Sequence, residues 1–209
     1  MNDCCTIPQS DQNTFDLAVI GAGSAGFSAA ITAAEGGKRV ALIGHGTIGG
    51  TCVNVGCVPS KTMIRAAEAM HGAQTAHRFP GLNGEAQVAD WSALIAAKDH
   101  LVATLRQKKY ADLLPGYGGV TYLDEGPARL VPGGVDVGGR RITAPKVIVA
   151  TGGRPAVPDI PGVQDAPSLD STSLLELDQL PESLIFLGGG YLGVELAQMM
   201  ARMGTRVTL

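Results

Sequence analysis

The sequence predicts an α/β fold with doubly wound, parallel sheets, and an internal repeat supports this prediction. Both ends of the chain show, in the same order, a short apolar strand, a Gly-x-Gly-x-x-Gly box, a helix and a second strand. The composition agrees with it: 45% of the 209 residues are hydrophobic, only 4% are aromatic, and 29 are glycine. Such a mixture suits Ala-rich helices joined by tight turns, in one large domain or two small ones.

Charge and cysteine content exclude several classes of protein. The formal net charge of −3 predicts no broad basic surface for nucleic acid. The first eight residues, MNDCCTIP, contain no apolar run, so we expect neither a signal peptide nor a membrane span. Four cysteines do not make a secreted disulfide framework, and the cytosol keeps most thiols reduced. We therefore expect a cytoplasmic protein whose cysteine pair is catalytic or metal-binding.

The first repeat is predicted to follow a flexible arm over residues 1–14. Residues 15–20 form an apolar strand, the Ala-rich stretch 24–35 forms a helix, and residues 39–43 form the next strand. The middle of the chain then predicts a helix over 51–71 that Pro59 kinks or restarts, a loop over 72–90, a long amphipathic helix over 91–114, short strands within 119–143 and a buried strand over 146–150.

The second repeat follows a predicted domain junction at residues 155–170, which contain four prolines. A strand over 183–187 leads into the second glycine box, and a helix over 194–203 precedes a strand over 206–209. A βαβ unit that stops at its second strand cannot complete a sheet. We therefore expect the chain to be a fragment of a longer protein, with one domain over 15–155 and the start of another over 168–209.

The first glycine box predicts a dinucleotide site. Gly21 permits a tight turn, Gly23 lets the backbone approach a pyrophosphate, and Gly26 allows close packing of the helix on the strand. An ordinary Gly-rich turn is disfavoured because a strand precedes the box and a helix follows it. The acidic residue that usually binds the ribose, about 20 positions on, is absent near Gly44 and His45. The ribose would then be held by backbone amides or water.

The most specific motif is the run GGTCVNVGCVPSK over residues 49–61, which contains Cys52 and Cys57. Gly56 and the start of a helix make it feasible for the two sulfurs to meet. A helix N-terminus with Lys61 four residues on favours the thiolate form of Cys57, which donates electrons or attacks a disulfide. A closed zinc site needs about four ligands, and only Cys4 and Cys5 remain, so zinc or a purely structural pair is the weaker interpretation.

Three motifs in the same order resemble the flavoprotein pyridine-nucleotide disulfide oxidoreductases. The run over 49–61 resembles their active-site segment, VIVATGGRP over 147–155 resembles the strand and turn that end their flavin domain, and GGGYLGVE over 188–195 resembles their nicotinamide-cofactor box. The resemblance covers residues 15–209. It implies a Rossmann-like FAD-binding domain followed by the start of a Rossmann-like NAD(P)-binding domain, and a homodimer in the full-length protein.

The resemblance also implies roles for individual residues. Cys57 would be the thiolate nearest the flavin, Cys52 the interchange thiol, and Lys61 a neighbour of the flavin ring. Residues carried over as FAD contacts are Gly21, Gly23, Gly26, Gly46, Thr51, Ala128, Thr151 and Gly152. Residues carried over as contacts of the nicotinamide cofactor are Gly188, Gly190 and Gly193. Tyr191 would shield the flavin, and Glu195 would support the nicotinamide or Lys61. For Tyr191 and Glu195 the alternative is ordinary packing and solvation at the start of a helix.

Within the family, Val53, Val58 and Ser60 favour the branch that reduces mercury. Soft Hg(II) prefers thiolates, and a buried Cys52–Cys57 pair would bind it as substrate. The function predicted is therefore NADPH-dependent reduction of Hg(II), or of its thiol complexes, to elemental mercury, with NADH as a possible donor. Two alternatives stay open: a disulfide reductase of the glutathione or lipoamide type, and a non-catalytic flavin- or metal-binding fragment. Cys4 and Cys5 are read as inert tail cysteines rather than as a mercury-scavenging handle.

Overall fold

The computed structural model describes residues 12–209, and the chain divides into two compact units. The first unit comprises residues up to Cys52 together with Leu105–Gly153, and the second comprises Val53–Thr104 and Arg154–Leu209. The units therefore do not follow chain order, because residues 53–104 belong with the C-terminal part. The functional domains expected at 15–155 and 168–209 stay a prediction.

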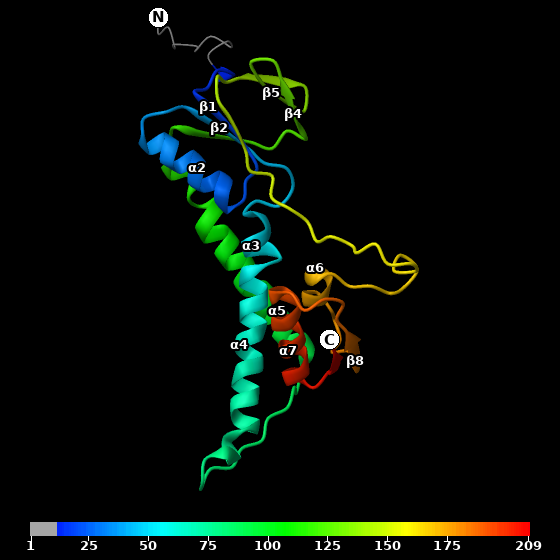
Figure 1. The fold of residues 1–209 in the computed structure, drawn as a ribbon. Coiled ribbons are helices and arrows are strands. Elements are labelled where there is room, and N and C mark those ends of the chain that lie inside the picture. The colour runs from blue at the N-terminus through cyan, green and yellow to red at the C-terminus, as the bar shows by residue number, and fades with distance from the viewer. Residues whose placement is uncertain (1–11) are drawn as a thin grey trace, which may run out of the picture. The chain divides into compact units, whose positions relative to one another are not determined.

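The first unit is built on a four-stranded parallel sheet (Figure 1). Its strands are β1 (Leu17–Ile20), β2 (Val40–Ile43), β3 (Val120–Leu123) and β7 (Val147–Val149), in the spatial order β3-β2-β1-β7. All three pairs are parallel, with Leu17 opposite Val40 and Val40 opposite Val120. The predicted α/β fold with a parallel sheet is confirmed.

Helix α2 (Ser24–Glu35) crosses from β1 to β2 and packs on this sheet. Its Phe27 and Ala30 are buried against Val19, Val40 and Leu42. The Phe27 ring also meets the Tyr110 ring edge to face, with centroids 4.8 Å apart. Burial of one such aromatic side chain contributes about 1.5–3 kcal/mol, so this packing holds the end of the glycine box firmly on the sheet.

A second sheet in the same unit is antiparallel. It contains β4 (Ala128–Val131), β5 (Gly134–Val137) and β6 (Arg140–Thr143) in sequential order. Val135, Val137 and Ile142 are fully buried in one cluster with Ala41 and Ile43 of the parallel sheet. Two-residue turns at Pro132–Gly133 and Gly138–Gly139 join these strands.

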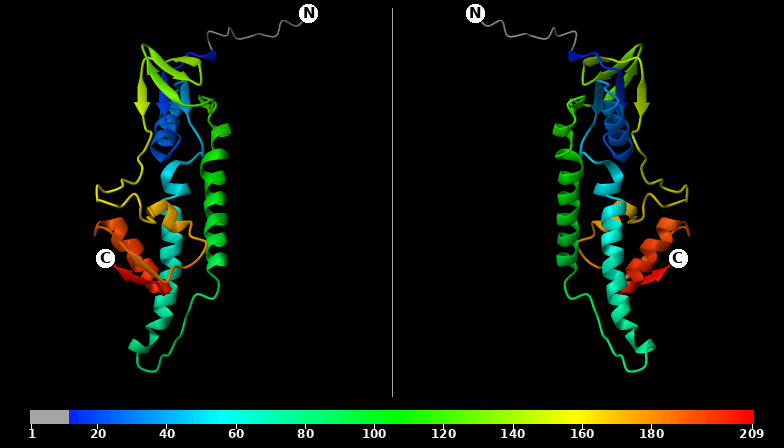
Figure 2. Two further views of the ribbon diagram at one scale, coloured as in Figure 1. Left: turned by 90° about the vertical axis from the view of Figure 1, so that its right-hand side faces the viewer. Right: turned by 90° about the vertical axis from the view of Figure 1, so that its left-hand side faces the viewer.

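The second unit is centred on two long helices, α4 (Cys57–Gln74) and α5 (Trp91–Arg106). They run in opposite directions beside each other, joined by a segment that includes the 3₁₀ turn η1 (Ala76–Arg78) (Figure 2). Met63 and Ala67 of α4 are buried with Trp91, whose indole N–H donates to the Leu177 carbonyl at 2.8 Å. Helix α5 is followed by a π-helical turn, η2 (Gln107–Ala111), and a 3₁₀ turn, η3 (Leu114–Gly116).

The C-terminal part of the second unit forms the second βαβ repeat. It contains α6 (Ser171–Leu175), β8 (Ser183–Ile185), α7 (Tyr191–Met203) and β9 (Arg206–Thr208). Strands β8 and β9 pair in parallel, and Met199, Met200 and Met203 of α7 are buried with residues of α4. The internal repeat predicted from the sequence is therefore confirmed.

Three details differ from the sequence-based expectations. The helix expected over 51–71 is broken at Gly56 rather than at Pro59, because Pro59 lies in the first turn of α4, where its missing N–H is not needed. The helix expected to reach Leu114 ends its α-helical part at Arg106. The strand expected to be buried is exposed at Ile148 and Val149, and within residues 12–209 it lies at the edge of its sheet, paired with β1.

Candidate functional site

The first glycine box forms a tight junction between β1, α2 and the end of β7. Gly21 adopts φ of +119°, and a Cβ there would overlap the Ala150 carbonyl and lie 3.1 Å from the Thr151 nitrogen. A Cβ at Gly26 would overlap the Gly21 carbonyl oxygen and lie 2.9 Å from its carbon. Only residues without a side chain fit at these two positions, as the sequence indicated. The junction also brings Thr151 beside Gly21.

The segment after β2 folds back onto the same box. The Gly49 amide donates to the Ala22 carbonyl at 2.9 Å, and Gly49 pairs with Gly23 in an isolated parallel bridge. A Cβ at Gly50 would lie 2.6 Å from the Gly23 Cα. Gly50 is therefore a site residue that the sequence analysis did not single out. In the sequence, only the Gly49-Gly50 pair indicates a close backbone contact here, because the contacting residue, Gly23, lies 27 positions earlier.

The second glycine box repeats the geometry of the first. Gly188 has φ of +104°, and a Cβ at Gly193 would lie 2.6 Å from the Gly188 carbonyl oxygen. The Val194 amide donates to the Gly190 carbonyl at 3.0 Å, as the Phe27 amide donates to the Gly23 carbonyl at 2.9 Å. Residues of the box line a pocket of about 310 Å³. Two separate boxes therefore present the same kind of loop.

Both boxes lead into a helix whose first turn lacks a side-chain cap. Gly23 precedes α2 and Gly190 precedes α7, and neither can supply a capping oxygen. The first amides of a helix have no partner inside the helix, and they carry the positive end of its dipole. Close backbone approach together with uncapped amides suits a pyrophosphate. The residues present therefore fit a dinucleotide at each box.

The cysteine run lies across two helices. Cys52 belongs to the short helix α3 (Gly50–Asn54), and Cys57 is the first residue of α4, with only Val55 and Gly56 between the helices. Cys52 is half-buried and Cys57 is exposed. The expectation of a buried pair is therefore wrong, because Cys57 stands in the exposed first turn of its helix. Thr51, beside Cys52, is exposed in α3.

Lys61 and Glu195 form an ion pair between α4 and α7. The Lys61 Nζ donates to both carboxylate oxygens of Glu195, at 2.5 and 2.6 Å. The side chains keep 54% and 44% of their surface exposed, so the pair contributes about 0–1 kcal/mol to stability. The ion pair instead links α4, which begins with Cys57, to α7, which begins at the second glycine box, and so fixes the position of the Lys61 side chain.

The remaining predicted residues are more dispersed. Gly46 follows β2 with φ of +79°, and Gly152 follows β7 with φ of +73°. Ala128 opens β4 and lies in the antiparallel sheet. Tyr191 keeps 81% of its surface exposed at the start of α7. Cys4 and Cys5 lie outside the described residues.

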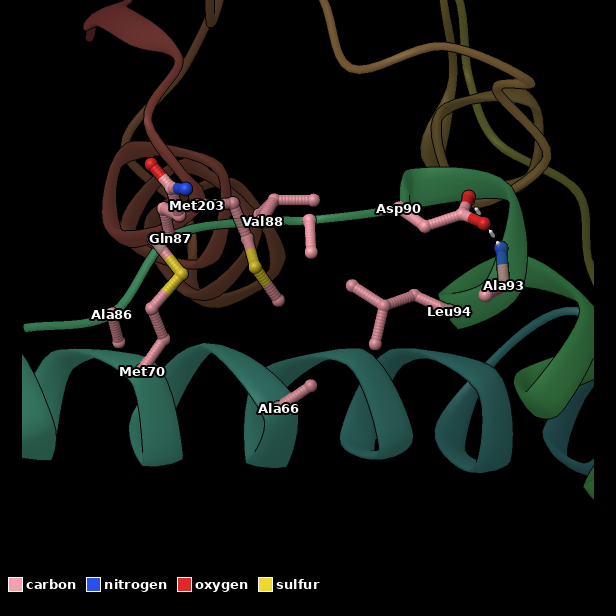
Figure 3. Close-up of a pocket in the computed structure, with 10 residues that line it drawn as sticks. Ala66, Met70, Ala86, Gln87, Val88, Asp90, Ala93, Leu94 and Met203 are labelled. Atoms are coloured by element: carbon pink, nitrogen blue, oxygen red, sulfur yellow. Dashed lines mark hydrogen bonds between the residues drawn. The ribbon is translucent and has the colours of Figure 1, made fainter.

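The second unit contains a pocket of about 420 Å³ that none of these predicted residues lines (Figure 3). Its lining is mostly apolar and includes Met70, Leu94 and Met203, which belong to or pack against the core of that unit. Asp90 at its rim accepts from the Ala93 amide at 3.1 Å and so caps α5. Hydrogen bonds from Ser92, chiefly through its hydroxyl, and from that amide hold the pKa of Asp90 below its usual value. We read this pocket as imperfect core packing.

Across residues 12–209, no helix is long and apolar enough to cross a bilayer.

Comparisons with known proteins agree on one family. A family model described as pyridine nucleotide-disulphide oxidoreductase matches residues 15–209. A mercuric reductase of Streptomyces lividans is 48% identical over 200 residues, covering 93% of this chain and 42% of that protein. A mercuric reductase of Staphylococcus aureus is 47% identical over 196 residues, covering 93% of this chain and 35% of that protein.

A solved structure agrees with these sequence matches. The HOCl-induced flavoprotein disulfide reductase RclA from Escherichia coli superposes with a TM-score of 0.77 at 36% identity. The match covers 92% of this chain and 41% of that protein. The chain thus spans less than half the length of each of these relatives.

Proposed function

The chain belongs to the pyridine nucleotide-disulphide oxidoreductase family, and from this premise we propose that it is part of an NADPH-dependent reductase of Hg(II). Family membership implies the use of FAD and of a pyridine nucleotide. The choice of NADPH over NADH, the Hg(II) substrate, a homodimer and a cytoplasmic location are proposals.

We assign FAD to the first glycine box. Gly21, Gly23 and Gly26 would hold its pyrophosphate against the uncapped start of α2, and Thr151 would lie beside them. The predicted contacts of Gly46, Thr51, Ala128 and Gly152 belong to the same proposal. When bound, FAD would carry two electrons from the nicotinamide to sulfur.

We assign NADPH to the second box. The geometry of Gly188, Gly190 and Gly193 supports this assignment because it repeats that of the first box. Tyr191 stands at the start of the same helix with its ring exposed, where a bound ligand could cover it. Glu195, one turn further, would orient Lys61 beside the flavin through their ion pair.

The Cys52–Cys57 pair would be the redox centre. The two residues lie five positions apart, on two helices separated by a two-residue turn. Cys57 is the first residue of α4. As a pair of thiolates they would bind Hg(II), a soft metal ion. Overall, NADPH would lose two electrons and one proton to become NADP⁺, the proton would pass to solvent, and Hg(II) would gain the two electrons and become Hg(0).

The observation that carries the choice of mercury is the identity with mercuric reductases, which is 40–48% across seven curated relatives. The aligned regions cover 92–96% of this chain. The similarity to RclA, described as a flavoprotein disulfide reductase, favours a second candidate: reduction of a disulfide substrate by the same dithiol.

A substrate comparison separates the two candidates. The protein should oxidise NADPH in the presence of Hg(II) and excess small thiol and release volatile mercury. It should turn over oxidised glutathione or lipoamide poorly. The variant Cys52→Ala/Cys57→Ala should lose mercury turnover, while Cys4→Ala/Cys5→Ala should keep it. Faster turnover with either disulfide than with thiol-bound mercury would favour the second candidate.

A further inference from the structure

The carboxyl end of β2 lacks the acidic residue that commonly binds an adenosine ribose. Gly44 occupies this place, directly after Ile43. Its amide donates to the Leu123 carbonyl of β3 at 2.9 Å, and the Gly21 amide donates to the Ile43 carbonyl at 2.8 Å. Gly44 therefore lies at the carboxyl ends of the parallel strands, beside the first glycine box. The ribose-binding carboxylate of a dinucleotide fold usually lies at this position.

The ring of Tyr122 fills the space that a side chain at Gly44 would need. A Cβ built on Gly44 would lie 2.8 Å from both Cε2 and Cζ of Tyr122 and would overlap the hydroxyl oxygen. Gly44 is not among the glycines with positive φ, so its backbone would accept a side chain. The phenol of Tyr122, rather than backbone strain, therefore occupies the space of a side chain at this position, and the ring would have to move to admit a carboxylate.

Tyr122 reaches this place from the neighbouring strand. In the register of β2 and β3 it lies opposite Leu42, and its ring packs beside the cluster that includes Val40 and Leu42. Its side chain is half-buried. Among the described residues, no protein group hydrogen-bonds to the Tyr122 hydroxyl. A polar atom is thus held at the ribose position with its hydrogen-bonding capacity unused.

The hydroxyl is held in its protonated form. Burial, and to a smaller extent the negative charge of Asp124, raise the pKa of Tyr122. A protonated phenol can donate one hydrogen bond and accept another, whereas a carboxylate only accepts. Ribose hydroxyls both donate and accept, so a phenol can hydrogen-bond to them, with a neutral bond that is weaker than the charge-assisted bonds of a carboxylate.

We propose that the Tyr122 hydroxyl takes the place of the missing carboxylate and binds the adenosine ribose hydroxyls of FAD. This inference rests on the proposed binding of FAD at the first glycine box. It replaces the expectation that backbone amides or water hold the ribose. Tyr122 would be a positioning residue for the adenosine end of the cofactor and would not take part in electron transfer.

The test measures FAD affinity of the apoprotein prepared from the holoprotein, for wild type, Tyr122→Phe and the matched control Tyr117→Phe. Each is titrated with FAD and with FAD analogues lacking the adenosine 2′- or 3′-hydroxyl. Loss of one hydrogen bond predicts that Tyr122→Phe binds FAD roughly three- to tenfold more weakly. Wild type should bind one of the two analogues more weakly than FAD by a similar factor. Tyr122→Phe should bind that analogue as tightly as it binds FAD. Tyr117→Phe should behave as wild type.

A second pair of variants tests the competition for space. Gly44→Glu alone should weaken FAD binding, because Tyr122 blocks the new side chain. Tyr122→Ala/Gly44→Glu should bind FAD more tightly than Tyr122→Ala, because the carboxylate then has room to bind the ribose. Both results would support the inference.

The possible failures are distinguishable. If Tyr122→Phe matches wild type toward FAD, or loses affinity equally for FAD and both analogues, the inference about Tyr122 is overturned while FAD binding stands. If wild-type protein binds no flavin at all, the proposed function is overturned and the inference with it.

Discussion

Gly26→Ala should destabilise the protein, although alanine is the better helix former. Gly26 is buried at the third position of α2. A Cβ there would overlap the Gly21 carbonyl oxygen, with the carbonyl carbon at 2.9 Å and the Val19 Cγ1 at 3.4 Å. The nearest obstacle is backbone of the glycine box itself, so it cannot rotate away as a side chain could.

The magnitude follows from two opposing terms. Alanine in place of glycine in a helix gains about 1 kcal/mol. Forcing a methyl group into a packed site costs about 1–3 kcal/mol, and a fixed backbone obstacle puts Gly26 at the upper end of that range. We expect a net loss of about 2 kcal/mol in the free energy of unfolding.

Gly72→Ala is the matched control. Gly72 lies in α4 with an exposed backbone, without positive φ, and a Cβ there would meet nothing within 4 Å. The same substitution should then stabilise the protein by about 0.5–1 kcal/mol.

Urea unfolding followed by far-UV circular dichroism measures both variants against wild type. The urea concentration at the unfolding midpoint should fall for Gly26→Ala and rise for Gly72→Ala. A Gly26→Ala protein as stable as wild type would refute the close approach of α2 to the glycine box. A Gly72→Ala protein that loses as much stability as Gly26→Ala would refute the role assigned to the local obstacle.

Three further predictions concern single side chains. Cys57→Ser and Cys52→Ser should each abolish NADPH-driven mercury turnover while leaving the content of bound flavin unchanged; a variant that keeps wild-type turnover would make its cysteine structural. Asp170→Ala should cost about 1 kcal/mol at pH 7, since Asp170 caps α6 through the Thr172 and Ser173 amides. Hydrogen bonds led by that of the Ser173 amide lower the pKa of Asp170 in the folded state, so this stabilisation is present above the unfolded pKa and is lost as the pH falls through the folded one. Unfolding at pH 7 and at pH 2.5 tests this, and an equal loss at both would contradict it. Trp91→Phe removes the indole donor and should cost about 1–3 kcal/mol in urea unfolding, because the Leu177 carbonyl loses its partner; a neutral effect would show that water replaces it.

Local patterns predicted the fold and both glycine boxes well, because each box couples a turn, a helix start and a strand within a few residues. The break at Gly56 was missed because a proline three residues later is the stronger local signal, although proline is harmless in a first turn. Exposure of the strand at β7 depends on its neighbours in the sheet, which periodicity does not reveal.

Contacts between distant positions escaped sequence reasoning most. Tyr122 reaches Gly44 across 78 positions, through the pairing of β3 with β2. The sequence showed that an acid was missing and gave no sign of what fills its place. Lys61 meets Glu195 across 134 positions. The family resemblance gave Glu195 two possible roles, support of the nicotinamide or of Lys61. The structure brings the Glu195 and Lys61 side chains together.

The central claim is that Cys52 and Cys57 form a redox-active pair driven by NADPH. Its most direct test counts alkylated cysteines by mass spectrometry, without oxygen, before and after one equivalent of NADPH is added. The Cys4→Ser/Cys5→Ser background removes the two tail thiols from the count. Two electrons should open one disulfide, so neither Cys52 nor Cys57 should be alkylated before NADPH, and both should be alkylated afterwards. Full alkylation of both residues in the oxidised protein, unchanged by NADPH, would contradict the account.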